Sequence, residues 1–212
     1  MGERQAGRYD GAEVRAWIVN WADPEQRQLQ FRGSIGEVVK DGATFRAELR
    51  SLAEVLNRPM GRVYQKPCSA VLGDRTCRFD LETPGYAVEL AVEHVEENRV
   101  LRFSTLTGYD ATWFRQGAVH VLTGAAQGLV GWIKEDRQEA DARVIALAEP
   151  MGAALAEGDT VRLVAGCDKR FTTCRLKFNN AVNFQGFPDI PGEDWLTVHA
   201  SQAAKKSGGS RR

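Results

Sequence analysis

Short runs of alternating apolar and polar residues dominate the chain and predict β-strands. The first sixty residues hold four such runs, at 14–21, 29–35, 37–39 and 44–49. The last two flank Asp41-Gly42, a dipeptide typical of tight hairpin turns. Phe45, Ala47 and Leu49 alternate with charged residues, so this strand should bury one face and expose the other. The chain therefore begins with a small antiparallel sheet.

A turn and a short helix complete this first segment. Asp23-Pro24 predicts a turn between the first two strands. Residues 52–57 are predicted to be helical, and the helix should end before Pro59. The strand at 14–21 has no obvious partner on one side, and an unpaired edge is suited to pairing with another chain. We expect this sheet to be completed by a neighbouring subunit or by residues that this chain lacks.

Six further apolar runs, separated by glycines and charged clusters, predict a second β-rich unit. They lie at 86–92, 99–106, 118–122, 129–134, 143–147 and 160–164. Short strands at regular spacing are typical of a small barrel or sandwich. The charged run at 135–141 is predicted to be the solvated tip of a hairpin. The fold class is therefore mainly β, with an antiparallel sheet and one short helix followed by a small barrel or sandwich.

Composition removes several classes of function. Lys and Arg together number 28 and Asp and Glu also number 28, so no net positive charge favours nucleic-acid binding. No apolar run approaches the roughly 20 residues needed to cross a bilayer. The first eight residues lack the apolar core of a secretory signal. Residues 200–212 predict a flexible basic tail, most simply a solvated one.

The chemistry of the sequence is concentrated in its four cysteines, Cys68, Cys77, Cys167 and Cys174. They form two pairs, with eight and six intervening residues, that bracket the second β-rich unit. Disulfides are rare in proteins kept in the cytosol. Structural zinc usually has one tighter pair of ligands, and four-iron clusters accept widely varying spacings. Spacing alone leaves disulfides, zinc, an iron–sulfur cluster and four free buried thiols open.

The surroundings of the second pair and the histidines refine these alternatives. Asp168, Lys169, Arg170 and Arg175 crowd the second cysteine pair. Nearby cations lower the pKa of thiols and offset the charge of a cluster, so lowered pKa values are expected here. A nucleophilic cysteine with a histidine base stays an alternative, because such partners meet in space and not in sequence. Three histidines, each expected on the surface or in ordinary packing, are present: His94, His120 and His199.

Several longer motifs lie at both ends of the chain. The C-terminal motifs are Gly166–Arg175, Lys177–Asn180, Asn183–Pro188 and Ile190–Gly192. The earlier ones are Gly7–Ala12, Trp17, Trp21, Asp23-Pro24 and Gly61–Cys77. Together they resemble the tail hub proteins of siphophage-like tails and of gene transfer agents, the phage-derived particles of some bacteria. The resemblance covers almost everything from Gly7 to about Ala200. It is specific, because long motifs agree in order at both cysteine pairs.

The resemblance implies a domain organisation and a cofactor. Residues 1–66 would form the tube-like hub segment, 67–199 a cysteine-bracketed β-module closed by a four-cysteine site, and 200–212 the tail. Family members carry a further β-rich stretch before the position of Gly7, so the hub segment is expected to be incomplete. The cysteine pattern is also similar to that of the lambda-like tail-tip iron–sulfur protein. By that likeness the ligands of a [4Fe-4S] cluster would be Cys68, Cys77, Cys167 and Cys174.

The resemblance also implies a structural function and no enzymatic one. Such hubs form a homotrimeric ring that joins the tail tube and distal tail protein to the central receptor-facing tip or fibre protein. DNA passes through the ring without sequence-specific binding. The protein would be assembled in the bacterial cytoplasm, carry no membrane anchor and reside at the tail tip. An iron–sulfur redox protein and a cysteine-dependent peptidase are the alternatives.

Overall fold

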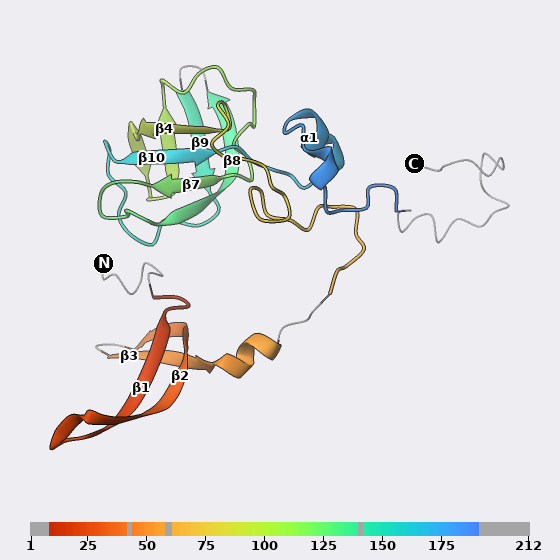
Figure 1. Ribbon diagram of the computed structural model, residues 1–212. Helices are drawn as coiled ribbons and strands as arrows, with labels where there is room; N and C mark the ends of the chain where they lie inside the picture. Colours follow the sequence, from red (N-terminus) through yellow and green to blue (C-terminus); the bar gives the residue numbers. More distant parts are fainter. Residues whose placement is uncertain (1–8, 42–43, 58–60, 140–141, 191–212) are drawn as a thin grey trace.

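The computed structural model describes residues 9–41, 44–57, 61–139 and 142–190. These residues form two antiparallel sheets, one of three strands and one of seven. Figure 1 shows the two sheets as separate bodies. The predicted class, mainly β with two units, is confirmed. Within the described residues no helix is long and apolar enough to span a membrane.

The three-stranded sheet is a meander with β2 at its centre. It comprises β1 (Glu13–Asn20), β2 (Asp23–Asp41) and β3 (Thr44–Ser51), followed by the 3-10 helix η2 (Leu52–Asn57). The predicted strands and helix are confirmed, with the runs at 29–35 and 37–39 merged into β2. The predicted turn at Asp23-Pro24 is wrong. Asn20 pairs with Asp23, so the turn lies at Trp21 and Ala22.

One face of this sheet, here called the apolar face, carries mostly hydrophobic side chains. Cross-strand partners share a face, and Ala16 lies opposite Phe31 while Ile35 lies opposite Leu49. Alternation along β1 places Ile18 on the same face as Ala16. Ile18 is 60% exposed and Leu49 52%. The expectation that this hairpin buries one of its faces within the chain is therefore wrong for the described residues.

The seven-stranded sheet curls into a half-barrel. Its strands are β4 (Ala87–Ala91), β5 (His94–Glu96), β6 (Val100–Phe103), β7 (Ala118–Val121), β8 (Val130–Glu139), β9 (Ala142–Leu147) and β10 (Thr160–Val164). Their order in the sheet is β4-β10-β7-β8-β9-β6-β5. The two edge strands, β4 and β5, are separated in the chain only by Val92 and Glu93. The sheet must therefore curve until its edges approach each other.

The concave side of the half-barrel encloses the hydrophobic core. Alternate residues of the strands point inward, as the alternating pattern predicts. The largest side chains that are fully shielded from solvent are Phe103, Phe114, Leu101, Ile145, Leu147 and Leu163. All six predicted strands are present, and the short β5 was not predicted. Burial of this size accounts for the stability of the half-barrel without the cysteines.

The charged run at 135–141 is not simply a hairpin tip. Strand β8 continues through it to Glu139, and residues 140–141 lie outside the described residues. Asp136 points inward from this strand and is buried with Arg143 of β9, at 2.7 Å between Oδ1 and Nε. The prediction failed because the inward-facing residue is itself charged, so the strand has no apolar alternation to detect.

This buried ion pair also anchors the long loop between β6 and β7. Asp136 Oδ2 accepts the backbone N–H of Phe114 at 2.7 Å. Arg143 donates to the backbone oxygens of Tyr109, at 3.0 Å, and Asp110, at 2.6 Å. All charges of the pair are thus used in hydrogen bonds, as burial requires. The loop is held at the end of the half-barrel that faces the cysteine-bearing segments.

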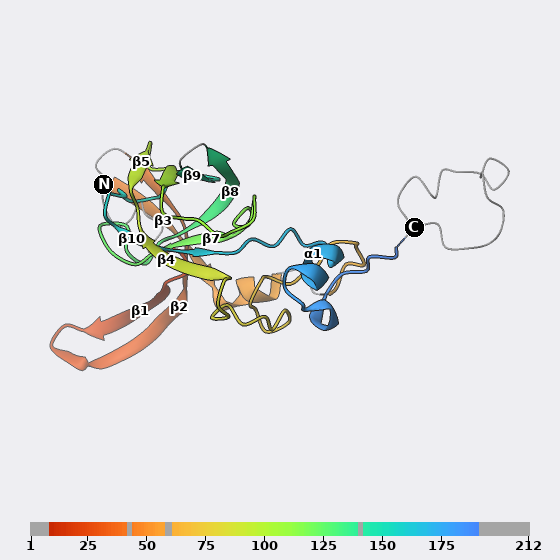
Figure 2. The same ribbon diagram turned by 90° about the horizontal axis from the view of Figure 1, so that it is seen from above.

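Two segments outside the sheets carry the cysteines. Residues 61–86 contain turns and no strand, and the second segment follows β10. The second segment forms the helix α1 (Phe171–Leu176) and the 3-10 helix η3 (Ala181–Asn183), neither of which was predicted. Figures 1 and 2 both show residues 61–86 lying beside α1. Stretches about 100 residues apart in sequence are therefore brought together.

Candidate metal centre

All four cysteines line one small pocket between the two segments. Two belong to residues 61–86, and two to the segment that contains α1. All four are free thiols, with Cys77 and Cys174 buried and Cys68 and Cys167 half-buried. The rest of the lining is apolar, amide or cationic: Ala70, Leu72, Lys169, Arg170, Phe178, Asn180, Asn183 and Phe184. Sequence analysis paired the cysteines, and the fold brings the two pairs together.

The four thiols share the lining of one pocket. Among the described residues no group of three His, Cys, Asp or Glu side chains is arranged to hold a metal ion.

A carboxylate organises the turn that carries the first pair. Asp74 accepts four hydrogen bonds, from the backbone N–H groups of Val71, Thr76 and Cys77 and from the Thr76 hydroxyl. These bonds hold the pKa of Asp74 far below its ordinary value. The bond from the Cys77 N–H makes the largest contribution. The preceding Gly73 has φ +81°, a conformation that glycine adopts without strain. Cys77 is thereby fixed relative to Cys68.

The second pair is organised by Asp168 in the same manner. Its carboxylate accepts the backbone N–H of Arg170 at 3.0 Å and the Thr173 hydroxyl at 2.9 Å. Helix α1 then places Cys174 about one turn from the loop that holds Cys167, and the Cys174 N–H donates to the Arg170 oxygen. A six-residue spacing can therefore aim both sulfurs into one pocket, because a loop and a helical turn lie between them.

Lys169 joins the two pairs directly. Its backbone oxygen accepts the N–H of Cys68 at 2.8 Å, and its ammonium donates to the oxygen of Ala70. Lys169 has φ 64°, a strained conformation for a residue with a side chain. The segment that carries Cys68 is thus hydrogen-bonded at Lys169, two residues after Cys167, to the segment that carries Cys167.

Two N–H groups of the C-terminal segment point at cysteine sulfurs. The side-chain amide of Asn180 lies 3.5 Å from Cys77 Sγ, and the backbone N–H of Gln185 lies 3.4 Å from Cys68 Sγ. The Cys174 thiol donates to the oxygen of Asn180 at 3.3 Å. Hydrogen bonds to sulfur ligands are a usual feature of thiolate-ligated centres. Asn180 and Gln185 both lie in motifs of the family resemblance, which assigned no role to either.

Burial, and not the neighbouring cations, sets the protonation of the second pair. It raises the pKa of Cys167, and Lys169 opposes this only in part. It raises the pKa of Cys174 to about 11, with the other three cysteines adding to the rise. The lowered pKa expected from Lys169, Arg170 and Arg175 is therefore wrong for these two thiols. The expectation failed because proximity in sequence does not reveal burial.

Lys177 and a group of aromatic rings attach the cysteine segments to the half-barrel. The Lys177 ammonium donates to the oxygens of Trp113, at 2.6 Å, and Gly166, at 2.9 Å, and lies 4.2 Å from the centre of the Trp113 ring. Burial lowers the pKa of Lys177 to about 8. Rings within about 6 Å of one another connect the parts: Phe79, Tyr86, Trp113 and Phe178.

A second contact, here called the clasp, joins residues 61–69 to residues 185–187. The N–H of Phe187 donates to the Gln65 oxygen at 2.9 Å, and the N–H of Ser69 donates to the Gln185 oxygen at 3.4 Å. The rings of Tyr64 and Phe187 lie 4.7 Å apart. The backbones approach so closely that a side chain at position 186 would collide with them. The clasp fixes the path of the chain between the three-stranded sheet and Cys68.

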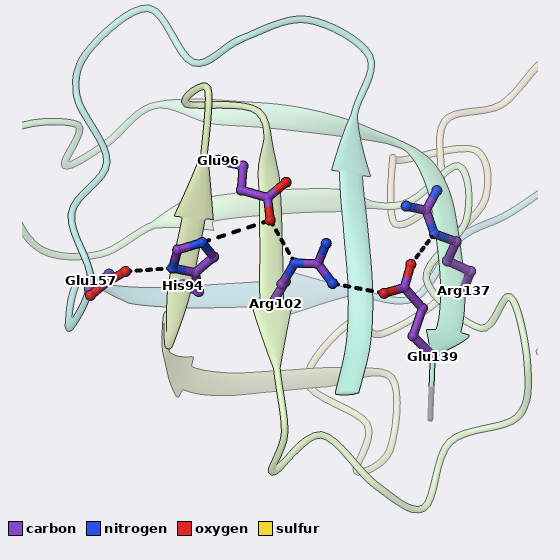
Figure 3. A network of polar contacts seen from close by, with 6 residues as sticks. All are labelled: His94, Glu96, Arg102, Arg137, Glu139 and Glu157. Carbon is purple, nitrogen blue, oxygen red and sulfur yellow. Dashed lines mark hydrogen bonds and ion pairs between the residues drawn. The ribbon is translucent and has the colours of Figure 1, made fainter. Parts of the chain in front are cut away.

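The described histidines lie away from the cysteines. His120 is half-buried on β7, and burial lowers its pKa. His94 is exposed on β5, with its Nδ1 2.7 Å from Glu157. Figure 3 shows it between Glu157 and Glu96 in a surface ion-pair network. The network continues through Arg102 and Glu139 to Arg137. His199 lies outside the described residues, and none of the described pocket-lining residues is a histidine.

Comparisons with known proteins agree with the fold. Residues 3–80 match the family "Baseplate hub protein, N-terminal attachment domain". Residues 112–194 match a family described as "Phage conserved hypothetical protein BR0599". A chain in the structure "Virion of native gene transfer agent (GTA) particle" is similar with a TM-score of 0.87 and 50% identity, over 98% of this chain and 72% of that chain. No curated protein matches.

An exposed attachment sheet, a compact half-barrel and a cysteine-lined junction define a β-rich structural protein of a phage-like particle. Half of the residues are identical to those of a virion chain over nearly the whole length. The chain belongs to the baseplate hub proteins of phage-like tails. The resemblance found in the sequence is thus confirmed, and the cysteine site stays a prediction.

Proposed function

We propose that this protein is the hub of a gene-transfer-agent or phage-like baseplate, a homotrimer that joins the tail tube and distal tail protein to the central tip protein. Its three-stranded sheet leaves β1 as an edge and exposes the apolar face. Uncovered edges and apolar faces favour association with other chains. DNA passes through the ring without base recognition, which suits a chain with no net charge.

The second part of the proposal is that Cys68, Cys77, Cys167 and Cys174 hold a [4Fe-4S] cluster. The observation that carries it is the convergence of all four thiols on one pocket. The donor set fits the group, because four thiolates are its usual ligands and two N–H groups already point at sulfurs. Lys169 and Arg170 in the lining offset the negative charge of four thiolates.

The arrangement favours a cluster over zinc and disulfides. Structural zinc usually takes at least one pair of ligands with two to four residues between them, whereas the pairs here have eight and six. Four-iron clusters accept four thiolates at widely varying spacings. Disulfides are disfavoured because all four thiols are free.

The role of the site is structural and not catalytic. Four protein thiolates complete the coordination of a cubane, so no position is open to a substrate. A cysteine nucleophile needs a thiolate, whereas burial raises the pKa of Cys174 and Cys167. A four-thiolate site contributes on the order of 10 kcal/mol, comparable with the whole stability of a domain. Its loss should therefore release the cysteine segments from each other.

Anaerobic purification of the full chain, with iron and acid-labile sulfide analysis, tests the cofactor. We expect about four of each per chain, and a broad visible absorbance that bleaches on reduction. Zinc at one equivalent, or two disulfides in the freshly isolated protein, would contradict the cluster. Assembly of the protein in the bacterial cytoplasm, where thiols stay reduced, is consistent with bound iron or with bound zinc.

Replacement of one cysteine tests the role. Cys167→Ser should abolish cluster retention and give misassembled or non-infective particles, because the second segment loses its tie to the first. Thr172→Ala, an exposed change on α1, is the matched control and should behave as wild type. Particle assembly is followed by electron microscopy and DNA delivery by gene-transfer frequency. Normal particles with normal delivery from Cys167→Ser would show that the structural role is wrong.

A further inference from the structure

Asn180 contacts one cysteine of each pair. Its side-chain Nδ2 lies 2.7 Å from the backbone oxygen of Cys77 and 3.5 Å from the Cys77 sulfur. Its backbone N–H donates to the Cys174 oxygen at 3.0 Å, and its own oxygen accepts the Cys174 thiol at 3.3 Å. Cys77 and Cys174 are also the two buried cysteines. One amide residue therefore connects the two halves of the pocket on its buried side.

The orientation of the Asn180 amide follows from its partners. The backbone oxygen of Cys77 can only accept, so the donor end of the amide must face it. At the other end, Oδ1 accepts the side-chain N–H of Asn183 at 2.7 Å. With both ends assigned, the second hydrogen of Nδ2 is directed toward the Cys77 sulfur. The amide is held by Asn183 in the orientation that a sulfur ligand needs.

An N–H aimed at a ligating sulfur has two effects. It fixes the ligand, and it stabilises negative charge on the sulfur, more strongly when the metal centre gains an electron. The Cys174 thiol loses its hydrogen on ligation, so its bond to the Asn180 oxygen is lost with it. The backbone bond from Asn180 to the Cys174 oxygen is independent of that hydrogen and keeps the two residues together.

We propose that Asn180 is the positioning residue of the cysteine centre. It holds Cys77 against Cys174 and, through its side-chain N–H, slows the loss of the bound metal centre and raises its reduction potential. The second effect rests on the proposed cluster. The first concerns the cysteines themselves and applies to the chain with or without iron.

Two aspartate variants one residue apart test the proposal with the same charge change. Asn180→Asp places a carboxylate oxygen against the sulfur and oxygen of Cys77. Asn179→Asp adds the same charge at an exposed neighbour, whose φ of 48° suits asparagine and aspartate alike. In the anaerobic full-length protein, Asn180→Asp should lose iron to a chelator roughly 10–100-fold faster. Its midpoint potential should fall, and Asn179→Asp should match wild type in both measurements.

A third variant separates the hydrogen bond from the charge. Asn180→Ala removes the side-chain donor and retains the backbone bonds. It should lower the potential in the same direction as Asn180→Asp and by less. If Asn180→Ala does not fold, Asn183→Ala keeps Asn180 and removes its anchor, and should shift the potential in that same direction. Equal potentials and equal rates of iron loss for the position 180 and 179 variants would overturn the proposal.

A measurement on the reduced, metal-free chain tests the positioning alone. Alkylation with iodoacetamide, followed by mass spectrometry, gives the rate at each cysteine. Asn180→Ala should increase labelling of Cys77 and Cys174 severalfold relative to Cys68, whereas Asn179→Asp, which suits the positive φ at that position, should leave the ratio unchanged. If wild type holds no iron, the proposed cofactor fails while this ratio still decides the positioning. An unchanged ratio in Asn180→Ala would refute the positioning.

Discussion

At the scale of single residues, carboxylates that bind backbone N–H groups set the geometry around the cysteines. Asp74 and Asp168 each accept backbone N–H groups beside one cysteine pair. Asp136 accepts the N–H of Phe114, in the loop where Trp113 contacts Lys177. Asp74 and Asp168 are partly solvated, whereas Asp136 and its partner Arg143 are buried. The buried pair is therefore the residue contact whose removal should have the largest effect on stability.

Arg143→Met should strongly destabilise the half-barrel. It leaves the Asp136 carboxylate buried without its counter-charge and removes the donors to Tyr109 and Asp110. Breaking a buried pair from one side costs about 3–5 kcal/mol. Denaturant unfolding of the variant measures this loss. The double variant Arg143→Met with Asp136→Leu should recover part of it, because no buried charge is then unpaired.

Arg137→Met provides the comparison on β8. Arg137 pairs with Glu135 and Glu139 on the surface, with its side chain 51% exposed. Exposed pairs contribute about 0–1 kcal/mol. If the two variants lost equal stability, burial of the Asp136–Arg143 pair would not be what makes it important.

At the scale of elements, the sequence predicts strands well where side chains alternate and poorly elsewhere. Strand β10 is predicted with its observed bounds, because apolar residues alternate with Arg162 and Thr160. The end of β8 is missed because Asp136 occupies an inward position. Helix α1 is six residues long, too short for a helical period to show. Strand β5, at three residues, gives no pattern either.

In the candidate centre, too, the sequence predicts what is local and misses what depends on tertiary packing. Sequence pairs Cys68 with Cys77 and Cys167 with Cys174, since each pair is local. The family resemblance implies that both pairs meet, and the fold shows them lining one pocket. The position of Asn180 between Cys77 and Cys174 is seen only in the fold. Burial likewise reverses the expected pKa shift of the second pair, because the desolvation of a thiol depends on tertiary packing.

The clasp can form only because residue 186 is a glycine. A Cβ at Gly186 would lie 2.6 Å from the oxygen of Lys66 and 2.7 Å from that of Pro67. Backbone oxygens cannot move aside as a flexible side chain can. Gly186→Val should therefore open the clasp, at about 1–3 kcal/mol of overpacking, and leave the unfolding midpoint of the half-barrel unchanged.

Limited proteolysis measures this opening. Cleavage within residues 61–67 should accelerate roughly five- to hundredfold in Gly186→Val, because cleavage follows the population of the open form. Pro188→Ala, an exposed change two residues on, should cleave as wild type. Identical cleavage of all three proteins would show that residues 61–69 are held by contacts other than the clasp.

At the scale of the whole molecule, the two sheets differ in whether their apolar side chains are buried within the chain. The half-barrel encloses its own core, with Phe103 and Leu101 fully buried. The three-stranded sheet leaves its apolar face exposed within the described residues. Between them, the clasp and the cysteine pocket determine where the chain leaves one body for the other.

The apolar face supplies the last prediction. Ile18→Ser with Leu49→Ser changes two side chains that are exposed in the single chain, so the chain itself should unfold as wild type, within about 0.5 kcal/mol. In the proposed ring these side chains are covered by a neighbour, and each is worth about 1.5–3 kcal/mol of apolar burial. The variant should therefore sediment as a monomer where wild type forms trimers, and should be absent from purified particles.

Exposed apolar residues outside the three-stranded sheet provide the control for this prediction. Val130→Ser with Val182→Ser removes side chains that are 47% and 97% exposed and lie outside the three-stranded sheet. If ring formation depends on the apolar face, this variant should still form trimers and enter particles. Equal loss of assembly in both variants would point to general surface hydrophobicity. Normal assembly of the Ile18→Ser, Leu49→Ser protein would exclude the apolar face from the ring contact and leave the β1 edge as the attachment surface.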